Sequence, residues 1–163
     1  MKHLAYLSLG TNLGNKEENL NTAIRLIEEQ IGDVVRLSAP YISEPWGFCS
    51  ENKFLNCALA LHTEFEPEGL LVVTQRIEQL MGRVHKSMDG QYRDRLIDID
   101  ILFYDALVMH SPILTIPHPL LHRRMFVLKP LVEIAPTLLH PIFNKNILEL
   151  LNILWQTEKE GKC

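Results

Sequence analysis

The sequence predicts an α+β fold with a ferredoxin-like βαββαβ core, in which helices are layered on an antiparallel sheet. Apolar runs of strand length alternate with two stretches in which apolar residues recur every three or four positions, in the order strand, helix, strand, strand, helix, strand. Glycine and proline stand at the joints between them. The length of 163 residues and the 47% hydrophobic content suit one self-sufficient core, so we expect a single domain over residues 1–163.

The first strand is predicted over residues 4–9, and glycines in the following G-T-N-L-G-N stretch, Gly10 among them, permit a tight turn. Asn15 is placed to cap a helix, with Glu18 completing a capping box. The apolar face of this helix carries Leu20, Ala23, Ile24, Ile27 and Ile31. Gly32 then follows as a helix stop. The turn lacks the G-x-x-x-x-G-K-[ST] pattern, so it is interpreted as a turn and not as a phosphate cradle.

The second and third strands are predicted over residues 34–42 and 54–62. The connection between them contains Pro45 and is long for a hairpin, which is typical of a mobile or functional loop. Alternation along the third strand places Phe54 and Asn56 on one side. Asn56 is the polar exception among apolar neighbours, so its amide needs partners, either backbone groups or a ligand.

Pro67 suits the first turn of a second helix. Its predicted core face carries Leu70, Val73, Ile77, Leu80 and Val84. Gln75 and Glu78 share the opposite face, for which a solvated surface is the default interpretation. Residues 82–91 form a second long polar connection before a fourth strand over residues 96–103.

Asp98 and Asp100 interrupt the apolar fourth strand. Period two places both carboxylates on one face, with Cβ atoms roughly 7 Å apart, so the two anions repel each other. The other face then carries Ile97, Ile99, Ile101 and Phe103. Mg²⁺ commonly takes one or two protein carboxylates and completes its shell with water and phosphate, and such a pair can serve two ions. The structural alternative is a strand end with two solvated aspartates, because D-x-D is a short pattern.

Basic residues gather before this strand, in a chain whose formal net charge is -4. They are Arg76, Arg83, Lys86, Arg93 and Arg95. Because arginine suits bidentate phosphate contacts, the acid pair together with these cations indicates a metal and a polyphosphate. The sequence pI of about 6.0 argues against a nucleic-acid partner, since duplex binding needs a basic face.

Apolar runs fall short of the ~20 residues that span a bilayer, and the N-terminus lacks a signal-peptide pattern. We therefore expect a cytoplasmic protein without membrane association. Cys49, Cys57 and Cys163 show no C-x-x-C spacing, so reduced thiols are expected and neither disulfides nor a zinc site.

Short motifs between residues 4 and 139 match, in order, those of one enzyme family. They read Y-L-S-L-G-T-N-L-G, Y-I-S-E-P-W-G-F, F-L-N-C-A-L, T-Q-R-I-E, G-R-V-H-K, D-R-L-I-D-I-D-I-L, and L-T-I-P-H through F-V-L-K-P-L-V-E-I-A-P. The chain in this respect resembles 6-hydroxymethyl-7,8-dihydropterin pyrophosphokinase of folate biosynthesis. The resemblance implies a monomeric α+β enzyme, an ATP-dependent diphosphokinase that uses two Mg²⁺ ions and small-molecule substrates.

The resemblance also implies roles for residues around the nucleotide. Asp98 and Asp100 would hold the metals and, with Arg83 and Arg95, carry the catalysis. The residues that would surround ATP are Gln75, Glu78, His85, Tyr92, Thr115, His118 and Arg124. His118 stands between two prolines, which hold it in a non-helical backbone.

For the pterin, the resemblance implies a sandwich between Phe54 and Phe126, with Asn56 pairing with the ring edge. A pterin is flat and carries an amide-like edge, so aromatic faces and one amide suit it. The residues that would complete this pocket are Ser43, Glu44, Pro45 and Trp46.

The chain departs from the family at several positions. Arg93 and Asp94 stand where W-G-P-R of many members has Gly-Pro, and His85 and Ile113 occupy places that are Arg in some members. These departures bear on the loop geometry and on the number of phosphate-binding cations.

The implied reaction is in-line attack of the pterin hydroxyl on the β-phosphorus of ATP, with AMP leaving. Positioning of the substrates and neutralisation of charge would supply most of the catalysis, so no protein general base is assigned. Residues 43–53 and 82–91 are expected to order over the substrates and exclude water. Two other classes remain open at this point, a Mg²⁺-dependent phosphohydrolase or nuclease and a non-catalytic module that senses a small metabolite.

Overall fold

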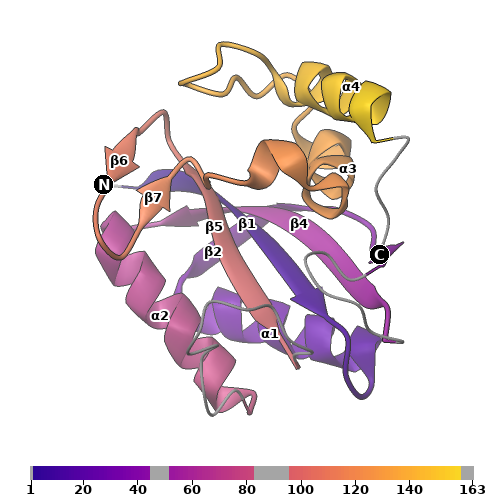
Figure 1. Cartoon of the computed structure of the whole chain (residues 1–163). Helices are drawn as coiled ribbons and strands as arrows, with labels where there is room; N and C mark the ends of the chain where they lie inside the picture. The colour runs from indigo at the N-terminus through magenta and orange to yellow at the C-terminus, as the bar shows by residue number, and fades with distance from the viewer. Residues whose placement is uncertain (1, 45–51, 83–95, 159–163) are drawn as a thin grey trace.

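The computed structural model describes residues 2–44, 52–82 and 96–158. One antiparallel sheet lies between two layers of helices, with α1 and α2 on one side and α3 and α4 on the other (Figure 1). The elements are, in chain order, β1 (His3–Thr11), α1 (Lys16–Gln30), β2 (Gly32–Leu37), β3 (Tyr41–Ser43), β4 (Phe54–Thr63), α2 (Pro67–Leu80), β5 (Asp98–Tyr104), β6 (Met109–His110), β7 (Thr115–Ile116), a short 3-10 helix (Leu121–Arg123), α3 (Met125–Ile134) and α4 (Ile147–Thr157).

The sheet has the strand order β2-β4-β1-β5, with β3 also paired to β4, and all of these pairs are antiparallel. Strand β4 lies between β1 and β2, and β1 lies between β4 and β5. Each βαβ unit is therefore split by a strand of the other unit, which is the predicted ferredoxin-like βαββαβ core. The α+β prediction from the sequence is confirmed.

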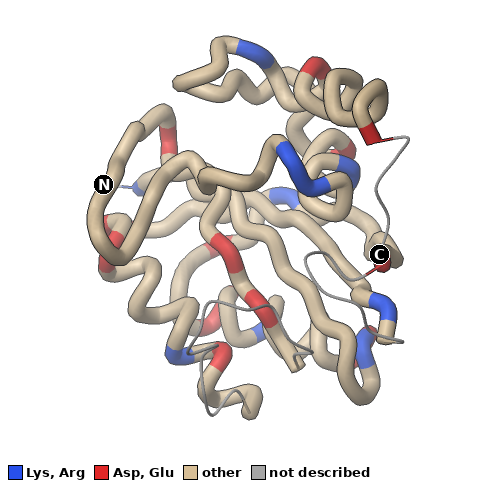
Figure 2. The backbone as a smooth tube through the Cα atoms, viewed as in Figure 1, with Lys and Arg blue, Asp and Glu red and all other residues tan. Residues whose placement is uncertain are grey.

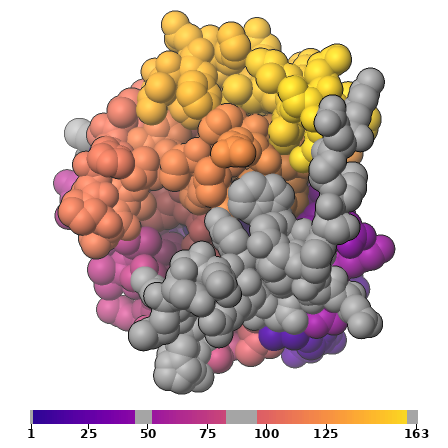
Figure 3. Space-filling model, viewed as in Figure 1, coloured from indigo at the N-terminus to yellow at the C-terminus, as the bar shows by residue number. Residues whose placement is uncertain are grey.

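Both faces of the sheet are buried, and β4 shows why. Its residues Cys57, Leu59 and Leu61 belong to the apolar core under α1 and α2. The alternate residues Ala58 and Ala60 belong to the second core, under α3 and α4. In the space-filling view, α3 and α4 form the upper part of the face shown (Figure 3). The alternation predicted for this strand is thus confirmed, and it serves two cores.

The predicted second strand, residues 34–42, is divided into β2 and β3, which both pair with β4. Between them the Ser38 amide donates to the carbonyl of Ala58 at 2.9 Å, and the Ser38 hydroxyl accepts from the Ala58 amide at 2.9 Å. Pro40 has no N–H to donate to a ladder. The single-strand prediction was wrong because these local bonds replace regular pairing.

Strand β5 is confirmed, but the predicted direction of Phe103 was wrong. Ile101 pairs with Leu7 and Phe103 pairs with Tyr6, so the register shifts by one residue on β5. A shift of this kind turns the following side chains to the opposite face. Phe103 consequently lies in the core under α3, where it contacts the Tyr6 ring edge-on at a centroid distance of 6.2 Å.

The C-terminal part adds the third layer to the βαββαβ core. Helix α3 contains the buried Pro130, which lies inside the helix without ending it. Within the described ranges, no helix combines the length and the apolar character needed to cross a bilayer.

Helix α1 ends at Gln30 with Ile31 as its cap, so Gly32 follows the helix end as predicted, and it is also the first residue of β2. A Cβ atom at Gly32 would overlap the backbone carbonyl oxygen of His62 on β4. We expect Gly32→Ala to lower the free energy of unfolding by about 1–3 kcal/mol, because the two strands must separate to admit the methyl group. Urea denaturation measures this.

The matched control is Gly69→Ala in α2, where the new Cβ would lie 3.4 Å from Cδ1 of Phe65, an ordinary contact. Alanine is favoured over glycine in a helix, so this change should leave the stability equal or slightly raised. Equal stabilities for the two variants would contradict the close-approach explanation.

Candidate active site

Asp98 and Asp100 lie at the start of β5, on the sheet face that α3 covers further along. Their neighbours Ile97, Ile99 and Ile101 belong to the opposite core, under α1 and α2. Alternation therefore turns both carboxylates to the α3 side, and both residues are half-buried. Figure 2 shows the acidic stretch of β5 in red, below the blue stretch that leads into α3. The predicted shared face of the two aspartates is confirmed.

The central strand β1 connects the aspartates to Asn56. Asp98 pairs with Gly10, which in turn pairs with Asn56 of β4. Adjacent strands lie about 4.8 Å apart, so Asp98 and Asn56 are roughly 10 Å apart on the same face. A Cβ atom at Gly10 would lie 3.0 Å from Oδ1 of Asn56 and 3.5 Å from Cδ1 of Phe54. Between the acidic residues and Asn56, the surface of β1 is formed by Gly10, which has no side chain to protrude from it. We call this surface the low strip of β1.

Ser8 and Gly10 were not predicted as site residues. Gly10 was interpreted as a turn residue, and it lies inside β1, opposite Asp98. Ser8 is its neighbour on the same face, opposite Asp100. The available signal was two small residues spaced by two on an otherwise apolar strand. Gly14, the second glycine of this stretch, does adopt a turn conformation with φ of 67°.

Arg124 supplies positive charge next to the aspartates. It is 3% exposed and lies at the N-terminal cap of α3. Its Nη1 is 3.7 Å from Oδ2 of Asp100, and its guanidinium carbon lies 5.6 Å from the centroid of the Phe126 ring. The start of α3 therefore brings a cation and an aromatic ring to the acidic face.

His118 is held in a neutral form. Its backbone N–H donates to the carbonyl of Leu102 at 3.0 Å, and its Nδ1 accepts from the Leu120 N–H at 3.1 Å. Burial, reinforced by the nearby Arg124 charge and opposed by Asp98, lowers the pKa of His118 to about 4. Because Nδ1 is an acceptor, the neutral ring carries its proton on Nε2, which is a donor. The predicted non-helical backbone at His118 is confirmed.

Glu78 does not lie on a solvated face. It is 4% exposed, and its Oε2 accepts a hydrogen bond from the backbone N–H of Ile99 at 2.8 Å. The default interpretation was wrong because helix α2 packs against the edge strand β5, so that its polar face meets the backbone of that strand. Gln75 is half-buried on α2, and Thr115 lies on β7, where its hydroxyl is 3.2 Å from Nδ1 of His110.

The amide of Asn56 is oriented by its neighbours. Asn56 is 1% exposed, and its Nδ2 donates to the Tyr41 carbonyl at 3.0 Å and to the Ser43 hydroxyl at 2.8 Å. An amide nitrogen has two protons, so both are used. The carbonyl oxygen, which lies toward Gly10, is the group that can accept from a ligand. The amide can therefore recognise a donor.

The remaining predicted pterin residues lie around this amide or outside the described ranges. Phe54 is the first residue of β4, on the face of Asn56, and Glu44 makes an exposed ion pair with Lys53 at 3.5 Å. The predicted site residues outside the described ranges are Pro45, Trp46, Arg83, His85, Tyr92 and Arg95. The same holds for Arg93, Asp94 and most of the two long connections.

The donor atoms on this face suit a hard cation. Among residues 2–44, 52–82 and 96–158, no group of three His, Cys, Asp or Glu side chains is placed to hold a metal ion. Asp98 and Asp100 offer two carboxylates. Mg²⁺ commonly takes one or two protein carboxylates as ligands, while phosphate and water oxygens complete its coordination shell. The residues present therefore fit Mg²⁺ better than a closed structural metal site.

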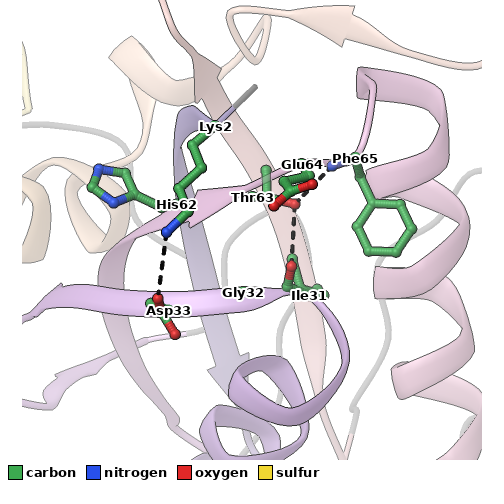
Figure 4. Close-up of a pocket in the computed structure, with 8 residues that line it drawn as sticks. All are labelled: Lys2, Ile31, Gly32, Asp33, His62, Thr63, Glu64 and Phe65. Atoms are coloured by element: carbon green, nitrogen blue, oxygen red, sulfur yellow. Dashed lines mark hydrogen bonds and ion pairs between the residues drawn. The ribbon is translucent and has the colours of Figure 1, made fainter.

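A hollow of about 400 Å³ lies at the opposite end of the sheet, where β2 begins and β4 ends (Figure 4). Its polar groups bond to one another, since Lys2 Nζ lies 4.0 Å from Asp33 Oδ2 and the Thr63 hydroxyl donates to the Ile31 carbonyl at 3.2 Å. It is separated from Asn56 by most of β4, so it is not the candidate active site.

The two buried histidines predict an acid-sensitive fold. His140 is 3% exposed, and its Nδ1 accepts from the N–H groups of Ile142 and Phe143. Burial and the neighbouring His122 lower the pKa of His140 to about 4, and the pKa of His118 is lowered to the same value. Between pH 6.5 and 4 the unfolded chain thus binds protons that the folded chain does not.

We expect the free energy of unfolding to be fully retained above pH 6.5 and to fall as the pH is lowered toward 4, with a slope that includes about one proton for each histidine. Urea denaturation at several pH values measures the slope. His140→Gln and His118→Gln should each reduce it, whereas His110→Gln on the exposed β6 is the control. An unchanged slope in both buried variants would contradict the assignment.

Comparison with known proteins agrees with this geometry. Residues 6–136 match the family model described as 7,8-dihydro-6-hydroxymethylpterin-pyrophosphokinase (HPPK). A 2-amino-4-hydroxy-6-hydroxymethyldihydropteridine pyrophosphokinase of Porphyromonas gingivalis is 45% identical over 139 residues, which cover 85% of this chain and 94% of that protein. The protein of the same name from Aquifex aeolicus is 38% identical over 144 residues, covering 88% of each.

Among solved structures, Plasmodium falciparum HPPK-DHPS with pteroate superposes with a TM-score of 0.82 at 20% identity, covering 99% of this chain and 46% of that one. The present chain thus spans less than half of that solved chain, and the likeness supports the fold. Since the matched region runs from within β1 to the end of α3 and includes Asp98 and Asp100, the chain belongs to the HPPK family.

Proposed function

We propose that this chain transfers pyrophosphate from ATP to the hydroxymethyl group of 6-hydroxymethyl-7,8-dihydropterin, releasing AMP, in folate biosynthesis. Its family and the relatives that carry this enzyme's name over nearly their whole length support the assignment. One structural observation carries it, namely the placement of Asp98, Asp100 and Asn56 on one sheet face with the low strip of β1 between them. Such a face can hold a charged polyphosphate at one end and a flat, hydrogen-bonding ring at the other.

For the nucleotide end, we propose that Asp98 and Asp100 hold two Mg²⁺ ions, which when bound neutralise charge around the β-phosphorus and make AMP a good leaving group. Arg124 lies next to Asp100, and neutral His118 offers its Nε2–H. Both groups are suited to phosphate oxygens, Arg124 by its charge and His118 as a donor whose lowered pKa keeps the ring neutral at neutral pH. Their task is to orient ATP for in-line attack.

For the pterin end, we propose that Oδ1 of Asn56 accepts from an N–H of the ring edge. The orientation of the Asn56 amide is fixed by Tyr41 and Ser43, which accept hydrogen bonds from its two N–H groups. Phe54, on the same face, and Phe126, next to Arg124, are suited to stack on the ring. The hydroxymethyl group would then point along β1 toward the aspartates.

We also propose that the chain acts as one domain, as a monomer and in the cytoplasm. Both helix layers pack on the same sheet, which supports one domain. The buried Cys57 is a free thiol, and a reducing compartment that supplies ATP agrees with this.

The test is direct. Protein, Mg-ATP and 6-hydroxymethyl-7,8-dihydropterin are incubated and followed by phosphorus NMR, which should show AMP and a pterin diphosphate in equal amounts. Accumulation of ADP, or of free pyrophosphate without pterin product, would refute the assignment. Binding of the pterin and an ATP analogue without turnover would instead support a sensor.

A further inference from the structure

Ile99 occupies a special place on β5, between the two aspartates. Asp98 pairs with Gly10, Ile99 with Leu9 and Asp100 with Ser8. In an antiparallel ladder, successive backbone N–H groups point alternately to the partner strand and away from it. Among the strands of the described residues, β5 is at the edge of the sheet, so an N–H that points away from β1 meets no neighbouring strand there. The Ile99 N–H meets Glu78 of α2 there, at 2.8 Å.

Glu78 is a buried carboxylate near the C-terminal end of α2. It lies in the last turn of α2, where the helix dipole disfavours a negative charge, and it is 4% exposed. Its hydrogen-bond partner stands between two further carboxylates. Burial of a charged group in such a place requires a strong interaction in return, and a backbone N–H donated to a carboxylate is one.

We infer that Glu78 is a positioning residue for the metal-binding aspartates: by holding the Ile99 amide, it fixes the backbone from which Asp98 and Asp100 project. This inference rests on the proposed function. A rotation of the Ile99 peptide about the strand axis would move both carboxylates together, and small errors in such a pair weaken metal and phosphate binding. Glu78 acts through the strand and not by touching the ions.

The placement of α2 supports action through the strand. Val73 and Ile77, on the same helix, pack in the core that also contains Ile97 and Ile99, which is the face opposite to the two aspartates. Glu78 therefore reaches the edge of β5 from the other side of the sheet. The bond joins the end of α2 to the centre of the D-x-D sequence.

The experiment compares Glu78→Gln and Glu78→Ala with the control Val73→Ala, which shortens a buried side chain of the same helix. Glutamine keeps an acceptor oxygen, so it should keep the Ile99 bond, and alanine should not. Amide hydrogen exchange of the ligand-free protein should show Ile99 protected in wild type, Glu78→Gln and Val73→Ala, and exchanging at least about 10-fold faster in Glu78→Ala. This readout needs no turnover.

The second readout is the Mg²⁺ concentration for half-maximal rate, measured where all variants are folded. It should rise by about 10-fold or more in Glu78→Ala and change little in Glu78→Gln and Val73→Ala, with the KM for the pterin unchanged throughout. If Glu78→Gln is as impaired as Glu78→Ala while Ile99 stays protected, the charge itself contacts ATP and the inference is wrong. An unchanged Mg²⁺ dependence in Glu78→Ala would show a merely structural role. If the wild type forms no product, the proposed function fails. Independently, equal exchange rates of the Ile99 amide in Glu78→Ala and in the wild type would refute the positioning bond.

Discussion

Replacing Asp100 by alanine should lower turnover on the order of 10²–10³-fold and should also destabilise the protein. The turnover falls because one of the two carboxylates that we propose to hold Mg²⁺ is lost from the acidic face. The stability falls because Arg124, 3% exposed, loses the carboxylate 3.7 Å from its Nη1. We expect a loss of about 1–2 kcal/mol, less than for a fully buried pair, because Asp100 is partly exposed and the distance is long.

Asp98→Ala is the informative partner of this variant. It should lose turnover to a similar extent, yet keep or gain stability, because removing one carboxylate relieves the repulsion between the two. The two variants should differ in stability because the contact with Arg124 is made by Asp100. Steady-state rates at saturating substrates and urea denaturation without metal give the two numbers.

Asp100→Asn serves as an isosteric control for Asp100→Ala, and it should be nearly as inactive because it lacks the charge. Asp33→Ala, at the exposed pair with Lys2 on the opposite end of the sheet, controls for loss of a carboxylate and should change neither quantity appreciably. Retained activity together with lost stability in both aspartate variants would favour the structural interpretation of the D-x-D sequence.

Asn56→Ala should raise the KM for the pterin by about 10–100-fold, while the KM for ATP stays close to that of the wild type. The variant removes the acceptor that faces the strip at Gly10 and leaves the aspartates, roughly 10 Å away, in place. It should also cost about 1–3 kcal/mol of stability, because the Tyr41 carbonyl and the Ser43 hydroxyl lose their donor.

Ser43→Ala provides a graded comparison. It removes one of the two groups that orient the amide and leaves the Tyr41 bond, so the effect on the pterin KM should be smaller and in the same direction. Initial rates with each substrate varied in turn distinguish the two constants. A parallel rise in both KM values for Asn56→Ala would indicate a general distortion of β4 and contradict a specific role in reading the pterin.

The sequence by itself determined those features that depend on neighbours a few residues apart. Asn15 caps α1 as predicted, with its Oδ1 accepting from the Glu18 N–H at 3.1 Å. Period two placed Asp98 and Asp100 on one face, and the same rule sorted β4 between two cores. Local backbone geometry decides such features, so a short window of sequence contains the necessary information.

Only the tertiary structure decided the features that need a partner from a distant segment. The direction of Phe103 follows from a register shift against β1, and the burial of Glu78 follows from α2 packing on the edge of β5. Likewise, β3 sets the polarity of the Asn56 amide, and α3 brings Arg124 to Asp100. Pairing register and helix packing depend on the free energy of the whole core, so they cannot be predicted from the periodicity of a single helix or strand.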